Sequence, residues 1–239
     1  MAETDQFPVE SIPMSEPTET GISGKGLYEV FFAPTAFFNR LKSQPKILVP
    51  YIVFGLLMAV GFYLLKGLSI DMQLQAARAR EAATPQMPSR QMLELFAFAI
   101  PTVLFLLAPL VESAFAAFWG NFIMAGNARF KQLLSVILYG EIIYAAGFLV
   151  QVPLMLYKKT VLVSLSLGVL VPNPSPTNVL YLILSKINVF LIWELIVVGI
   201  GLSIIYGFSR NKGFLLSVLS VGLLAALQLA TSLIGIAMQ

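Results

Sequence analysis

The chain has 239 residues, of which 58% are hydrophobic and only 11% are charged, and its mean hydropathy is +0.84. Soluble globular domains carry about 25% charged residues, so lipid must cover part of a surface with this few charges. The absence of cysteine and histidine excludes disulfides, thiolate metal sites and the commonest catalytic base. The net charge of +3 is scattered and forms no basic stripe of the kind that binds nucleic acid.

The N-terminal stretch 1–27 differs in composition from the rest of the chain. It is acidic and rich in proline, serine and threonine, and it lacks the basic start and apolar core of a signal peptide. This composition predicts a disordered tail over 1–27, followed by a membrane domain over 28–239.

Five later stretches are long and apolar enough to cross a bilayer, whose core of about 30 Å requires about 20 helical residues. Backbone groups in lipid must be hydrogen-bonded internally, which favours helices over open strands. We therefore expect an all-α polytopic membrane protein with about five transmembrane helices and an N-terminal interfacial helix. The predicted spans are 47–65, 93–119, 133–157, 189–208 and 213–238.

The segments between the spans differ in character. The stretch 66–91 is the longest polar one and predicts a solvated loop with a short helix over its AARAREAA sequence. The stretches 160–171 and 178–187 are apolar but too short to span, so we expect interfacial or re-entrant placement. Lys and Arg counts differ little between the two sides. The short basic loops around Arg129 and Arg210 favour a cytoplasmic N-terminus.

Aromatic and basic residues gather ahead of the first span. A proline that can open a helix lies among four phenylalanines, and three cations follow. We expect an interfacial helix with its aromatics at the acyl boundary and its cations at the headgroups. It serves either as an anchor for the first span or as a docking surface for a partner or lipid. The residues are Phe31, Phe32, Pro34, Phe37, Phe38, Arg40, Lys42 and Lys46.

Two carboxylates lie at similar depths inside the second and third spans, where a charge costs at least about 2.5 kcal/mol. Glu112 lies about 12 Å, and Glu141 about 15 Å, from the cytoplasmic ends of their spans at 1.5 Å per residue. We expect them to meet inside the bundle. They form either a proton or cation site or a structural hydrogen-bonded pair, with Tyr139, Tyr144 or Asn121 as further partners.

A third intramembrane carboxylate, Glu194, lies near the start of the fourth predicted span. Counting from that start places it close to the opposite membrane face, near Lys186 and Asn188. We expect an interfacial ion pair or a helix cap there.

Small residues recur every four positions on the fourth and fifth predicted spans. Such stripes allow close helix packing, either within the chain or between copies in a homo-oligomer. The short connection between these spans predicts an antiparallel hairpin and favours packing within the chain. The stripes are Gly199, Ser203 and Gly207, and Gly222, Ala226 and Ala230.

Three segments of the sequence together resemble the Yip-one domain family, the Ypt/Rab-interacting integral membrane proteins. VFFAPTAFFNRLKSQPKILVP resembles the family's Phe-x-x-Pro entry segment, and WGNFIMAGNARFKQLLSVILYGEII resembles its second loop and third span. KINVFLIWELIVVGIGLSIIYGFSRNKG resembles an Asp-x-Phe-x-x-Trp motif followed by a Gly-rich span and a basic turn. Phe190 and Trp193 match that motif, while Asn188 replaces its usual acid.

The resemblance implies a five-helix bundle with a cytosolic N-terminus, and the short tail resembles the prokaryotic branch. We therefore expect a non-enzymatic protein of the prokaryotic cytoplasmic membrane, without cofactor, that acts as scaffold or accessory subunit of another membrane complex. The alternative is a small ion-coupled carrier that uses Glu112 and Glu141. A hydrolase or a nucleotide-binding enzyme is disfavoured because the sequence contains neither GxSxG nor a Walker loop.

Overall fold

The computed structural model describes residues 24–80, 89–161, 165–172, 175, 178–223, 226, 229–230 and 233. These residues form helices and one isolated β-bridge, between Ser166 and Asn188. In chain order the elements are α1 (Gly24–Phe32), α2 (Pro34–Leu41), α3 (Leu48–Arg80), α4 (Arg90–Glu94), π-helix η1 (Leu95–Ala99), α5 (Ile100–Ala117), π-helix η2 (Phe118–Ile123), α6 (Phe130–Lys158), 3₁₀-helix η3 (Leu167–Leu170), α7 (Val179–Lys186), α8 (Val189–Tyr206), α9 (Arg210–Ser217) and π-helix η4 (Val218–Gly222).

The prediction of an all-α polytopic membrane protein is confirmed. Within the described residues, four helical stretches are long and apolar enough to span a bilayer: Leu48–Gln75, Arg90–Ile123, Phe130–Lys158 and Val189–Tyr206. They overlap the first four predicted spans. The start of the fifth is helical as α9 and η4, and most of its later residues lie outside the described part of the chain. The predicted tail also lies outside it, except that α1 begins at Gly24, inside that stretch.

The prediction of a polar loop directly after the first span is wrong for its first half. Helix α3 continues without interruption from Leu48 to Arg80. No proline occurs in the sequence between Pro50 and Pro85, and the polar residues there are good helix formers, so the helix does not end at Lys66. A helix of this length measures about 50 Å, longer than a bilayer core of about 30 Å.

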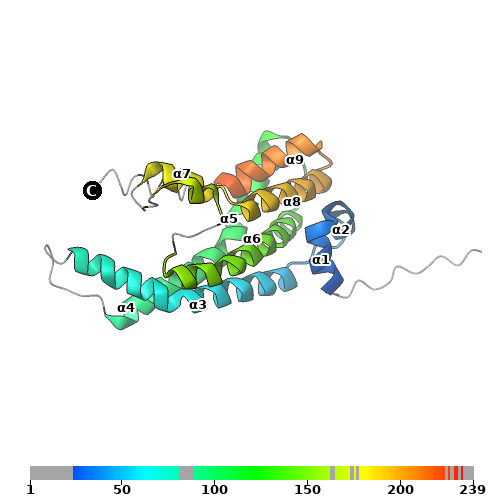
Figure 1. Ribbon diagram of the computed structural model, residues 1–239. Coiled ribbons are helices and arrows are strands. Elements are labelled where there is room, and N and C mark those ends of the chain that lie inside the picture. Colours follow the sequence, from blue (N-terminus) through cyan, green and yellow to red (C-terminus); the bar gives the residue numbers. More distant parts are fainter. Residues whose placement is uncertain are drawn as a thin grey trace, which may run out of the picture.

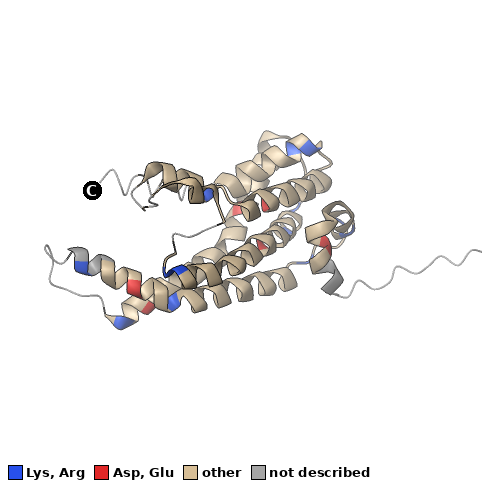
Figure 2. Cartoon of the chain, in the orientation of Figure 1, with Lys and Arg blue, Asp and Glu red and all other residues tan. Residues whose placement is uncertain are grey.

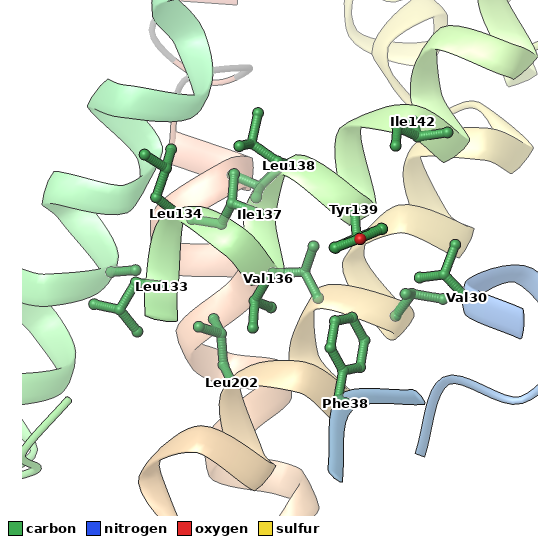
Figure 3. Close-up of a cluster of buried hydrophobic side chains, with 14 of the residues drawn as sticks. Val30, Phe38, Leu133, Leu134, Val136, Ile137, Leu138, Tyr139, Ile142 and Leu202 are labelled. Atoms are coloured by element: carbon green, nitrogen blue, oxygen red, sulfur yellow. The ribbon is translucent and has the colours of Figure 1, made fainter. Parts of the chain in front are cut away.

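Helix α6 lies at the centre of the bundle, in contact with α3, α5 and α8 (Figure 1). Its N-terminal half is buried almost without a break from Leu133 to Ile143. Figure 3 shows side chains of α1, α2, α6 and α8 meeting there, with Phe38 and Val136 beside Leu202. The core of the protein therefore forms around α6, and α1 and α2 are among the helices that pack against it.

Hydrogen bonds join the N-terminal segment to three other helices, α6, α8 and α9, at one end of the bundle. Lys42 Nζ donates to the carbonyl of Ile204 at 2.9 Å, and Arg210 Nη2 donates to Thr35 Oγ1 at 3.1 Å. Gln132 Nε2 donates to the carbonyl of Lys42 at 3.1 Å. The N-terminal helix pair, the start of α6, the end of α8 and the start of α9 thus share one end of the bundle.

The opposite end is closed by the segment that precedes α8. Gln151 Oε1 accepts from the backbone N–H of Leu165 at 2.9 Å, and Leu167 N–H donates to the carbonyl of Ile187 at 2.9 Å. Helix α7 packs against η3 in the same region. As a result, α8 begins well inside the length of α6 rather than level with its end.

Candidate functional site

Three helices bring three glutamates together inside the bundle. Glu112 of α5, Glu141 of α6 and Glu194 of α8 are only 3%, 4% and 1% exposed. One carboxylate oxygen from each lies within 4.8 Å of the other two. Figure 2 shows acidic positions on ribbons in the middle of the bundle, between the basic residues at its two ends. We call these three residues the glutamate cluster.

Glycines on α6 allow α8 to approach closely enough to bring Glu194 into the cluster. A Cβ on Gly140 would lie 2.3 Å from Val198 Cγ2 and 3.4 Å from Glu194 Cγ. A Cβ on Gly147, two turns further along, would lie 2.1 Å from Phe190 Cγ. Small residues at a helix interface are typical of close packing between membrane helices. They therefore set the position of α8 beside Glu141.

Proline shapes the turn of α5 that carries Glu112. Pro109 has no N–H to donate within the helix, and the Ser113 hydroxyl donates to its carbonyl at 2.5 Å. Ser113 is fully buried beside Glu112. The wall of the cluster on this side is therefore a turn of helix that lacks one backbone hydrogen bond, at Pro109.

The hydrogen bonding within the cluster is incomplete. The Glu112 and Glu141 carboxyl groups lie beside each other, and a hydrogen bond between them would require one proton shared by the two groups. Glu112 Oε2 and Glu194 Oε1 are buried and have no hydrogen-bond partner. Within the described residues the charged neighbours of these groups are one another, with no Lys or Arg beside them. Such a site suits a proton or a hard cation.

The structure places Glu112 and Glu141 together, as depth counting predicted, but the expectation for Glu194 is wrong. Glu194 joins the cluster instead of pairing near the membrane face. The error arose because depth was counted from the start of α8, which begins deep in the bundle. Asn121, a suggested partner, instead binds Ala128 through both amide atoms, at 3.0 and 3.2 Å.

The three residues of the recognised motif on α8 have separate structural roles. Asn188 caps the helix, with its Oδ1 accepting from Leu191 N–H at 2.7 Å. Because asparagine and aspartate cap about equally well, the amide can replace the family's usual acid in this task. Phe190 packs on Gly147, and Trp193 meets the rings of Phe31 and Phe32 at 5.6 and 6.3 Å.

The N-terminal aromatics divide between protein and exterior. Pro34 opens α2 as predicted, whereas the expectation that all four phenylalanines lie at the acyl boundary is wrong. Phe38 is fully buried beside Gly201, and Phe37 packs on the ring of Tyr139. Phe32 remains 65% exposed. The segment is therefore held by protein contacts as well as by its exposed face.

The stripe of small residues predicted on α8 packs within the chain. Its partners are residues of α9 rather than the stripe predicted on the fifth span. A Cβ on Gly199 would lie 2.9 Å from Phe214 Cα, and one on Gly213 only 2.4 Å from the Gly199 carbonyl. Ser217 Oγ donates to the Leu195 carbonyl at 2.8 Å. Gly207 instead ends α8 with φ of 72°, a conformation that favours glycine.

Sequence reasoning missed two groups of residues that build the site. Gly140 faces Val198 and Glu194 of α8, and Gly147 faces Phe190. The seven-residue spacing of the two glycines on one helix was the available signal. Pro109 lies three residues before Glu112, and Ser113 follows it directly. None of the four is a titratable or metal-ligating residue, so a search for such side chains passes over them.

Comparison with known proteins gives one family and one relative. A family model described as the Yip1 domain matches residues 28–232. Membrane protein YknW of Bacillus subtilis (strain 168) is 22% identical over 220 residues, which cover 90% of this chain and 94% of that protein. No solved structure matches.

Proposed function

This chain belongs to the Yip1 domain family, and from that premise we propose that it is a non-enzymatic scaffold or accessory subunit of another membrane system. The relative in Bacillus agrees with the prokaryotic branch that the sequence resembles. We place the protein in a prokaryotic cytoplasmic membrane, with its N-terminus in the cytoplasm.

The observation that carries this proposal is the unequal burial of the spans. In the apolar segment of Arg90–Ile123 only 11% of the residues are buried within the chain, whereas 72% are buried in the apolar segment of α6. Large apolar side chains recur on this stretch every three to seven residues and remain exposed. Among them are Leu104, Leu107, Val111, Phe118 and Phe122. An accessory subunit needs a helix face of this kind, free to dock on a helix of its partner.

Site-specific photocrosslinking in native membranes tests the proposal. A photoreactive residue at Leu104 or Leu107 should give one discrete protein adduct, identified by mass spectrometry. The matched control is Leu56 of α3, which is equally apolar and equally exposed. Lipid adducts alone at all three positions would contradict a partner on α5.

The membrane orientation is testable because the chain has no cysteine of its own. A cysteine at Asn127, in the loop before α6, should resist an impermeant thiol reagent in intact cells. A cysteine at Ser89, before α4, should react. The reverse pattern would place the N-terminus outside.

A small ion-coupled carrier is the second candidate, and the glutamate cluster is the observation that favours it. Purified protein in liposomes should then drive a proton or cation flux that Glu112→Gln with Glu141→Gln abolishes. A flux equal to that of empty liposomes would leave the accessory role as the only candidate of the two.

A further inference from the structure

We propose that the glutamate cluster binds one hard divalent cation, Mg²⁺, Ca²⁺ or Mn²⁺, between α5, α6 and α8. The inference goes beyond the accessory role and does not rest on it. A bound ion would join three helices that are far apart in the sequence.

The spacing of the carboxylates fits a single ion. Oxygen ligands lie about 2.0–2.6 Å from these metals, so two ligands on opposite sides of one ion are separated by about 4–5 Å. The three carboxylate oxygens lie within 4.8 Å of one another. One ion at their centre therefore reaches all three residues with little movement of the helices.

The unpaired oxygens provide a separate indication of a ligand. Glu112 Oε2 and Glu194 Oε1 are buried without a donor, and each unmet group of this kind costs about 1–3 kcal/mol or more when charged. No N–H or O–H group of the described residues donates to either atom, so a ligand held between the three carboxyl groups is the remaining source of a contact. A cation supplies the missing contacts to both oxygens.

The charge of the cluster leads to the same ligand. Three carboxyl groups are buried with no Lys or Arg beside them in the described chain, and an isolated buried charge is very unfavourable. A divalent ion together with the proton shared by Glu112 and Glu141 neutralises all three. A site made of carboxylates selects hard ions over zinc or copper, which prefer nitrogen and sulfur ligands that this chain lacks.

Mn²⁺ binding to the purified full chain in detergent, after treatment with a chelator, is the test. Electron paramagnetic resonance of free Mn²⁺ should show saturable binding of one ion per chain, displaced by Mg²⁺ or Ca²⁺. Glu141→Gln, Glu112→Gln and Glu194→Gln should each weaken binding on the order of tenfold or more. The control is Glu94→Gln, an exposed carboxylate paired with Arg90, which should bind as the wild type does.

A second measurement on the wild type keeps the proposal testable if a variant fails to fold. Adding Mn²⁺ to the unbuffered, chelator-treated protein should release protons, because the metal competes with protons for the same oxygens. The apparent affinity should therefore rise with pH. An equal concentration of K⁺ should release none.

Three results would overturn the proposal. They are no saturable Mn²⁺ binding to the wild type, binding unchanged in all three glutamine variants, and proton release equal with K⁺ and Mn²⁺. The first and third would assign the cluster to protons alone. None of these results changes the crosslinks expected from α5, so failure of the ion site and failure of the accessory role are distinguishable.

Discussion

Helix α6 and the stretch Arg90–Ile123 are both long and strongly apolar, yet they occupy opposite environments. In the apolar segment of α6, 72% of the residues are buried in the protein, whereas only 11% are buried in the apolar segment of the other stretch. The two helical stretches differ in how much of their surface meets other helices of the chain. Gly140 and Gly147 of α6 admit a neighbouring helix, whereas Leu104, Leu107 and Phe122 of the other stretch project outward. Hydropathy thus identifies a span, whereas the contacts between helices in the folded chain decide which span becomes the core.

The largest effect should come from removing a buried leucine of α6. Leu138→Ala should lower the free energy of unfolding by about 2–5 kcal/mol, because Leu138 is fully buried and a cavity remains. Leu104→Ala on α5, where the side chain is 61% exposed, should change it by no more than about 0.5 kcal/mol. Thermal unfolding in one detergent compares the two. Equal losses would refute the contrast between the helices.

A smaller effect should come from filling a close helix contact. Gly147→Ala should cost about 1–3 kcal/mol, because its Cβ would overlap the ring of Phe190. The control is Gly67→Ala in α3, where a Cβ meets nothing within 4 Å. That change should instead stabilise the helix by about 0.5–1 kcal/mol. If both alanines were tolerated, α8 would not be positioned by Gly147.

The smallest effect on stability should come from the buried glutamates between α5 and α6. Glu112→Gln with Glu141→Gln should keep the fold, because glutamine has the same shape and carries no charge to bury. Infrared difference spectra of the metal-free protein between pH 5 and pH 9 should show a protonated carboxyl band that the double change removes. A band that persisted in the double variant would belong to another carboxyl group. A wild type without the band would hold no shared proton.

Residue patterns were sufficient for the helical class, the first four spans and the pairing of Glu112 with Glu141. These follow from the length of apolar runs and from a constant rise per residue, both of which are local. The same local counting failed for Glu194, because the segment before α8 folds back along α6 and makes α8 begin deeper in the bundle. It also failed for Phe37 and Phe38, since an aromatic side chain suits a lipid boundary and a protein core equally well.

By itself, the sequence determined that this protein is embedded in a membrane and that it crosses the bilayer as helices. It also determined that the spans carry carboxylates and that the chain has no histidine or cysteine. Composition decides these properties, because a bilayer accepts only apolar segments with internally bonded backbones. Only the tertiary structure decided that α6 is the core, that α2 belongs to its wall and that Glu194 completes the cluster. Those outcomes depend on which helices approach closely, and that is a property of pairs of surfaces rather than of any one segment.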